Sequence, residues 1–229
     1  MFVTFLEGVQ RYCRECGVSS DNLTTVVGQS GQLRKMVDWY ADAWVNIQIS
    51  RRTWRFMRLS TSWVLTAGQG GYTRAQCGVA TGTFKAWIDG TGRTYYTGNL
   101  NSEQSLDYRE YDSFRNVWLI GANRTVTSRP QEFTIAPDDT LIVGPLPIAG
   151  LTASMDYHKK PVRLSADADV PAVPEGHDDM MIVHLAKKYY GAFYGARETY
   201  ASGNTEYKRM YRLLSNDQLP EMSIEGAFR

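Results

Sequence analysis

One stretch, residues 30–52, restricts the fold of this chain more than any other. Its large apolar side chains recur at steps of three and four residues, which places them on one face of a helix. They are Leu33, Met36, Val37, Tyr40, Trp44 and Ile47. A helix of about twenty residues needs packing partners along its length, because isolated helices are marginally stable. We expect these partners from residues 1–16 and 177–215, at the two ends of the chain.

The segment between them, residues 54–165, has the pattern of a β-rich insertion. Strands are expected at 56–66, 72–73, 83–89, 93–97, 131–135, 141–143 and 151–159. Gly90-Thr91-Gly92 predicts a hairpin between two of these strands, 83–89 and 93–97. Residues 98–105 read as a polar loop, and residues 106–119 as a short helix or as a helical turn followed by an extended piece. Short strands separated by turn signals predict a small sandwich or a barrel-like domain.

The predicted fold class is therefore α+β, with an antiparallel bundle of long helices and an inserted β-sandwich or barrel-like domain. The helical stalk is expected at 1–53 and 177–216, the β-rich domain at 54–165 and a linker rich in proline and acidic residues at 166–176. A helix from residue 178 to about 202 is predicted to break at Ser202-Gly203-Asn204, before a final helix. Residues 217–229 are expected to form an extended tail.

Charge and cysteine content exclude several classes of protein. The 25 basic and 24 acidic residues give a net charge of +1, which argues against a dedicated nucleic-acid binder. No apolar run approaches the ~18–20 residues that cross a bilayer, so no membrane association is predicted. Three cysteines are an odd number and too few for a disulfide framework. This usage is typical of an intracellular protein with reduced thiols.

None of the reactive side chains forms a convincing catalytic or metal-binding motif. Cys13 and Cys16 have the spacing of a metal or redox pair, but they close a predicted helix and no second pair exists, so packing is favoured. His177 is expected to help cap a helix beside two aspartates, and His184 to be packed in a core or interface. Asp156 and His158 share a strand face without a nucleophile. We predict no enzyme activity, no cofactor and no metal.

Several segments, spread over nearly the whole chain, resemble one protein family. They are GQSGQLRKMVDWYADAWVNIQISRRTWRFMR, the β region that begins TSWVLTAGQGGYT, then TLIVGPLP, MDYHKKPVRLSADADVPAVPEGHDDMMIVHLAKKYYGAFY and LSNDQLPEM. With this order of elements the chain resembles the adaptor, or head–tail connector, proteins of tailed bacteriophages.

The resemblance implies a virion protein, assembled in the host cytoplasm, that forms a ring of commonly twelve copies beneath the portal. The ring would extend the DNA channel without sequence-specific binding and offer a platform for a tail or nozzle protein. A C-terminal segment often reaches into the portal in this family. The resemblance implies that its counterpart here would be residues 219–229, with Leu219, Met222, Ile224 and Phe228 as the expected apolar anchors.

The helices themselves indicate contacts between copies. The predicted helix from residue 178 is apolar nearly all round, which is typical of a helix that is central or sandwiched between subunits. Rings arise from head-to-tail contacts that close by rotation. The residues expected at such an interface are Trp44, Tyr189, Tyr190, Phe193 and Tyr194.

A second function remains open from the sequence. The β-rich domain carries Trp63, Trp87, Tyr95 and Tyr96, which could line a face for stacking sugars. The chain would then be a carbohydrate- or protein-binding component of a tail.

Overall fold

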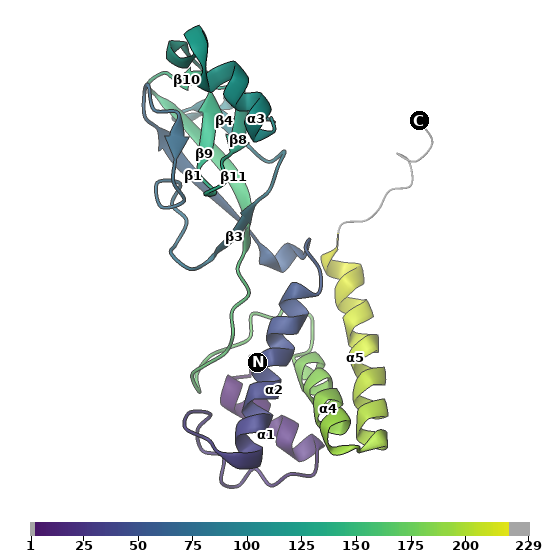
Figure 1. The fold of residues 1–229 in the computed structure, drawn as a ribbon. Helices are drawn as coiled ribbons and strands as arrows, with labels where there is room; N and C mark the ends of the chain where they lie inside the picture. Colours follow the sequence, from purple (N-terminus) through teal and green to yellow (C-terminus); the bar gives the residue numbers. More distant parts are fainter. Residues whose placement is uncertain (1–2, 220–229) are drawn as a thin grey trace, which may run out of the picture. The chain divides into compact units, whose positions relative to one another are not determined.

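The computed structural model describes residues 3–219 and divides the chain into two compact units (Figure 1). The helical unit comprises Met1–Phe56 and Pro161–Arg229, and the β unit comprises Met57–Lys160. The β unit overlaps the β-rich segment expected at 54–165, while the five-part division of the chain stays a prediction. None of the helices in residues 3–219 is long and apolar enough to span a membrane.

Within residues 3–219, four α-helices build the helical unit: α1 (Phe5–Glu15), α2 (Gly31–Ile49), α4 (Met180–Tyr194) and α5 (Arg197–Gln218). α1 begins with a capping box, in which Thr4 and Glu7 bond each other's backbone N–H groups. Because the Glu7 carboxylate accepts the Thr4 N–H and hydroxyl, its pKa lies below the usual value. This cap satisfies N–H groups that the first turn of a helix leaves unpaired.

The core of the helical unit contains residues from the N-terminal and the C-terminal segments of the chain. The Tyr12 hydroxyl of α1 is fully buried and donates to the Ala186 carbonyl of α4 at 2.9 Å. Met36, Tyr40 and Ile47 of α2 are also fully buried, as their spacing predicted. The buried indole of Trp54 follows α2 and donates from Nε1 to the Ile47 carbonyl at 3.0 Å. Residues distant in the chain thus share one core.

Two glycines allow α4 and α5 to pack closely. A Cβ at Gly191 would lie 2.5 Å from the Tyr200 backbone nitrogen, and one at Gly203 would lie 2.8 Å from the His184 carbonyl oxygen. The predicted break at residues 202–204 is wrong, because Gly203 lies inside α5 and serves this close approach. The chain turns at Gly195 instead, where φ is 68°, a left-handed conformation that glycine adopts without strain.

The segment that precedes α4 packs along the helical unit. The Asp167 carboxylate accepts the Val26 N–H at 2.6 Å, and the Asp169 carbonyl accepts the Phe5 N–H at 2.7 Å. Both aspartates lie in the predicted linker, residues 166–176, and their hydrogen bonds hold this segment against the helical unit. At the other end, residues 217 and 218, which were predicted to begin an extended tail, belong to α5 instead, because this helix continues through Gln218.

The β unit contains three sheets within the described residues. The largest has the strand order β1 (Arg58–Leu65), β11 (Leu151–Lys159), β4 (Arg93–Tyr96), β5 (Asn99–Ser105), and β3 (Phe84–Trp87) also pairs with β11. A second has the order β2 (Gly71–Tyr72), β9 (Leu141–Gly144), β8 (Glu132–Ile135), β6 (Asp107–Tyr108). The third joins β10 (Leu146–Pro147) with β7 (Thr127–Ser128).

β11 organises the largest sheet. Its alternate residues Leu151, Ala153, Met155 and Tyr157 are buried, as expected for a strand with one face on a core. One edge of β11 pairs with β1 along eight residue pairs, and the other edge is divided between β4 and β3. The predicted hairpin between residues 83–89 and 93–97 is therefore wrong, since both strands pair with β11.

Two other predictions for the β unit need correction. Residues 98–105 are not a loop: β5 pairs with β4 as an exposed, polar edge strand. Residues 106–119 contain β6, the short α3 (Tyr111–Phe114) and a π-helical turn (Arg115–Leu119), so the initial part is a strand and the rest is helical. β6 forms because it pairs with β8, a partner distant in sequence.

The structure confirms the coarse prediction of a chain that mixes helices with β-sheets. One buried cluster takes side chains from the two larger sheets, including Trp63, Phe133 and Met155. The structure does not confirm a long antiparallel bundle or a closed barrel. α1 has only 11 residues, and the main path of the largest sheet begins at β1 and ends at β5 without closing.

Candidate functional site

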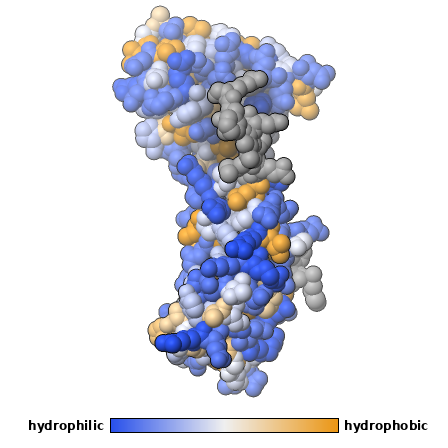
Figure 2. Space-filling view, turned by 90° about the vertical axis from the view of Figure 1, so that its right-hand side faces the viewer, coloured by the Kyte–Doolittle hydropathy of each residue, from blue (hydrophilic) through white to orange (hydrophobic). Residues whose placement is uncertain are grey.

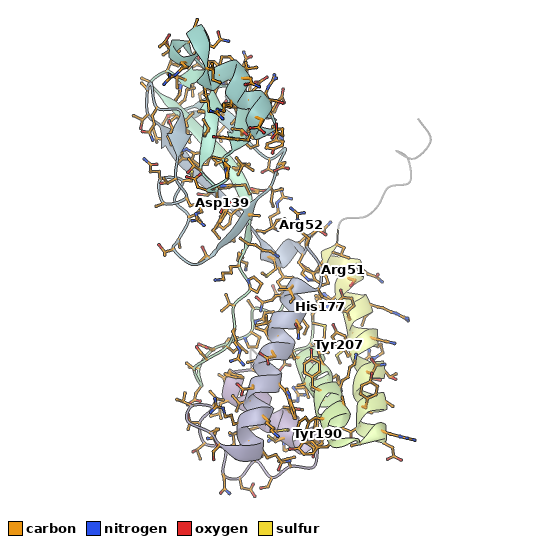
Figure 3. The ribbon with its side chains drawn as sticks, viewed as in Figure 1. Arg51, Arg52, Asp139, His177, Tyr190 and Tyr207 are labelled. Atoms are coloured by element: carbon orange, nitrogen blue, oxygen red, sulfur yellow. The ribbon has the colours of Figure 1, made fainter. Side chains whose placement is uncertain are left out.

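Four aromatic rings meet at the surface of the helical unit and form the candidate site. We call Trp39 of α2 with Tyr190, Phe193 and Tyr194 of α4 the aromatic cluster. Trp39 lies 5.4 Å from Phe193 between ring centroids, and it meets Tyr190 and Tyr194 edge-on at 6.4 Å and 6.3 Å. Figure 3 labels Tyr190 near the end of α4 that leads to α5. Such edge-to-face contacts are favourable for aromatic pairs.

Helix geometry explains why these rings converge. Tyr190, Phe193 and Tyr194 are three and four residues apart, so they lie on one face of the last turn of α4. Gly195 ends the helix directly after them. On α2, Lys35 lies one turn before Trp39 and places its ammonium 4.1 Å from the centre of the Phe193 ring. This cation–π contact covers only part of the cluster.

The cluster is exposed despite its apolar character. The Phe193 side chain is 57% exposed and Tyr194 is 45% exposed. Partial burial raises the pKa of the Tyr190 hydroxyl, so this group is neutral at physiological pH. On the face seen in Figure 2, the hydrophobic residues of the helical unit form separate small areas among hydrophilic ones. Adjacent exposed aromatic rings with a basic neighbour are typical of protein contact surfaces.

Three of the five residues predicted at a subunit interface belong to this cluster. The other two lie elsewhere: Trp44 is 3% exposed and stacks on Phe56, and the half-buried Tyr189 accepts a hydrogen bond from Asn46 at 2.9 Å. Trp44 therefore has little surface to offer a neighbouring copy. The sequence analysis missed Trp39, which sits at the border between the apolar and polar faces of α2.

Of the predicted portal-binding residues, the structure describes only Leu219. It is half-buried, adopts an extended conformation and caps α5 through its N–H, which donates to the Ser215 carbonyl. Met222, Ile224 and Phe228 lie outside the described residues.

The two tryptophans that the sequence suggested for a sugar-stacking face are buried. Trp63 is 8% exposed and Trp87 is 5% exposed, and both belong to the core of the β unit. The Trp87 indole also donates to the Asp139 carbonyl. Only Tyr95, half-buried, and Tyr96, 42% exposed, reach the surface. Two tyrosines alone do not form the face that the sequence suggested.

The thiols and imidazoles do not form a chemical centre. Burial raises the pKa of Cys13 to about 11 and of Cys16 to about 12, so both stay protonated, as packing cysteines do. Burial lowers the pKa of His184, which is consistent with the expected packed position. His177 does not cap α4 but lies 3.1 Å from the Asp217 carboxylate of α5. No cluster of metal-ligating side chains exists within residues 3–219.

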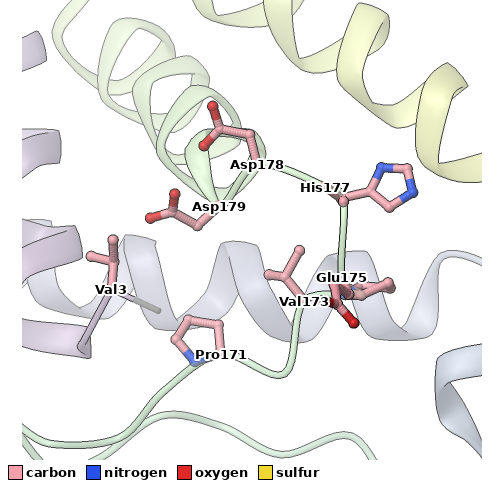
Figure 4. A pocket seen from close by; sticks show the side chains of 9 residues that line it. Val3, Pro171, Val173, Glu175, His177, Asp178 and Asp179 are labelled. Atoms are coloured by element: carbon pink, nitrogen blue, oxygen red, sulfur yellow. The ribbon is translucent and has the colours of Figure 1, made fainter. Parts of the chain in front are cut away.

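A cavity of about 320 Å³ lies beside the start of α4, and two adjacent carboxylates line it (Figure 4). Asp178 accepts the Met180 N–H at 2.9 Å, and its pKa is lowered. Burial and the neighbouring Asp178 raise the pKa of Asp179 from 3.8 to about 6, although Arg11 lies 3.5 Å away. The two carboxylates thus oppose each other in their effects on stability.

Replacing Asp179 with Asn is expected to stabilise the helical unit at neutral pH by about 1 kcal/mol. A raised folded-state pKa means that the folded chain holds a proton that the unfolded chain has lost, so stability falls as pH rises from about 4 to 6. Asp179→Asn removes this pH-dependent loss of stability. Near pH 4 the variant and the wild type should therefore be equally stable. Urea unfolding at a series of pH values measures the difference.

Asp178→Asn is the control for that experiment. Its carboxylate accepts a backbone N–H at a helix start, where negative charge is favourable, so its loss should destabilise at pH 7. Equal effects of the two substitutions would contradict our assignment of opposite roles.

The comparison with protein families decides the identity of the chain. A family model described as SU10 adaptor protein matches residues 4–225. The chain belongs to that family. The adaptor match covers nearly all of both units, in agreement with the resemblance seen in the sequence. Comparison with curated proteins gave no match. Membership makes the chain a structural component of the phage particle that interacts with portal and tail proteins.

Proposed function

We propose that this adaptor forms a closed ring beneath the portal, in which neighbouring copies meet through the aromatic cluster. The observation that carries the proposal is the exposure of adjacent rings at the end of α4 in an adaptor-family chain. A closed ring needs two different surfaces of each copy, one for each neighbour. The aromatic cluster supplies one of them, and about twelve copies would close the ring.

The ring would extend the channel for the genome and present a platform for a tail or nozzle protein. The helical unit would act as the stalk, as an antiparallel bundle in the assembled ring, and residues 219–229 would engage the portal. The role is structural and not enzymatic, and it needs no cofactor. A net charge of +1 suits a channel that does not hold DNA by its overall charge.

Double substitution of the cluster, Phe193→Ser with Tyr194→Ser, is expected to abolish assembly. Both rings are exposed, so the variant should fold while the contact loses its apolar surface. Light scattering of the purified chain, alone and with portal, measures the mass of the assembly. Tyr96→Ser with Tyr108→Ser removes two rings of similar exposure from the β unit and should leave the mass unchanged.

A chain truncated after Gln218 separates portal docking from contacts between copies. We expect it to lose portal docking while the aromatic cluster stays intact. Unchanged ring mass in the Phe193/Tyr194 variant would refute the interface, and unchanged docking after truncation would refute the role of the tail.

A further inference from the structure

Three exposed arginines follow α2 within five residues: Arg51, Arg52 and Arg55. None of them lies within ion-pair distance of a carboxylate in the part of the chain that the structure describes. Arg55 donates a long hydrogen bond of 3.4 Å to the backbone carbonyl of Asp217. We call these three residues the arginine cluster.

The backbone that carries the arginine cluster is firmly held. Trp54 lies among the three arginines and is fully buried, with its Nε1 bonded to the Ile47 carbonyl. Ser50, directly before them, donates to the same carbonyl at 2.7 Å and accepts a hydrogen bond from Tyr211 at 3.2 Å. Figure 3 shows Arg51 and Arg52 at the end of α2, near the C-terminal part of α5. The backbone that carries the three guanidinium groups is therefore held in place by the buried Trp54 and the hydrogen bonds of Ser50.

Several other arginines of the described chain form ion pairs with carboxylates. Arg163 lies 3.1 Å from both Asp38 and Asp42, and Arg109 makes a two-pronged contact with Glu132. Asp217 interacts electrostatically with Arg55, but its carboxylate lies 3.1 Å from the His177 ring and forms no ion pair with Arg55. Residues 51–55 thus carry three exposed arginines that form no ion pair with a carboxylate among residues 3–219.

We propose that the arginine cluster binds the phosphate backbone of duplex DNA without reading its sequence. The planar guanidinium fork matches phosphate oxygens and stays charged at any physiological pH. Residues 51–55 span at most about 14 Å of extended chain, so the three groups reach phosphates within one turn of the duplex, about 34 Å. The choice of DNA among polyanions rests on the proposed function, in which the genome passes along the adaptor.

Two competing roles for the arginine cluster lead to different expected results. Positive charge just beyond a helix C-terminus complements the helix dipole, and then the arginines would serve stability alone. An acidic face of a protein partner could also bind them, and then portal docking would depend on them while DNA binding would not.

The test uses the full-length chain and a short fluorescein-labelled duplex, with binding followed by anisotropy between about 50 and 200 mM salt. Three phosphate contacts predict that log Kobs falls with log salt with a slope near −2.7, at about 0.9 per contact. Arg51→Gln/Arg52→Gln/Arg55→Gln should weaken binding at least tenfold at the lowest salt and flatten the slope. The matched control Arg115→Gln/Arg124→Gln/Arg197→Gln removes the same charge from exposed, scattered positions.

Unchanged DNA affinity in the cluster variant, or an equal loss in the control, would overturn the proposal. Loss of thermal stability without loss of DNA binding would assign the arginines to the helix dipole, and loss of portal docking alone would assign them to a protein partner. The ring is measured separately by its mass. A variant that assembles but does not bind DNA supports the arginine cluster, whereas a wild-type chain that binds DNA but never assembles refutes only the proposed ring.

Discussion

Replacing Trp54 with Ala is expected to destabilise the helical unit by about 4 kcal/mol, because removal of a fully buried aromatic ring from a core costs about 3–5 kcal/mol. The Trp54 side chain has no exposed surface. Its ring packs on Phe56 at 5.6 Å and meets Tyr211 of α5 edge-on at 5.8 Å. The substitution would leave a cavity between the end of α2 and α5, and it would also remove the donor to the Ile47 carbonyl.

Two further variants separate the ring from its hydrogen bond. Trp54→Phe keeps an aromatic ring and loses the donor, so we expect a loss of about 1–2 kcal/mol. Trp39→Ala removes the same side chain from a half-buried position and should cost less than Trp54→Ala. Urea unfolding followed by helical circular dichroism measures all three, and near-UV circular dichroism follows the unfolding of the β unit separately. A loss below about 2 kcal/mol for Trp54→Ala would contradict its place at the centre of this packing.

The sequence predicted the helices of the helical unit because their signal is local. The three- and four-residue spacing of Met36, Tyr40 and Ile47 matches their complete burial in α2. The long strand 151–159 was predicted equally well, since alternating residues face the core. In both cases the side-chain pattern and the tertiary packing favour the same structure.

The errors in the β unit come from pairing between distant residues. β5 is polar and exposed, with no alternation to reveal it, and it is a strand only because β4 pairs with it. The glycines at 90 and 92 suggested a hairpin between the strands on either side of them. These strands, β3 and β4, each pair with β11 instead. A turn signal shows where the chain can reverse and not which strand becomes the partner.

The sequence predicted only part of the candidate site, because packing between elements distant in sequence decides which apolar side chains stay exposed. The spacing of Tyr190, Phe193 and Tyr194 placed them on one face of a helix, and the structure brings them together. Trp44 shares the apolar face of α2 but that face is covered within the helical unit, whereas Trp39 at its border stays accessible. The sequence marks apolar faces, and only the packing of α2 against α4 shows which of them remains exposed.

Introducing Val at position 203 is expected to destabilise the helical unit by about 3 kcal/mol, through forced separation of α4 from α5. A Cβ there would lie 2.8 Å from the His184 carbonyl oxygen and 2.9 Å from the Lys188 backbone nitrogen. Both are backbone atoms of α4, so no side-chain rotation relieves the contact. The better helix propensity of a non-glycine residue offsets at most about 1 kcal/mol of this cost.

Ser202→Val is the matched control, because residue 202 is exposed and one position away in the same helix. It introduces the same side chain without the contact with α4 and should change stability by less than about 0.5 kcal/mol. Gly191→Ala should repeat the Gly203 effect, since its Cβ would meet the Tyr200 backbone from the opposite side of the interface. Because α4 carries three rings of the aromatic cluster, displacement of α4 in the Gly203 variant should also weaken assembly. A Gly203→Val chain as stable as Ser202→Val would show that α4 and α5 are not packed this closely.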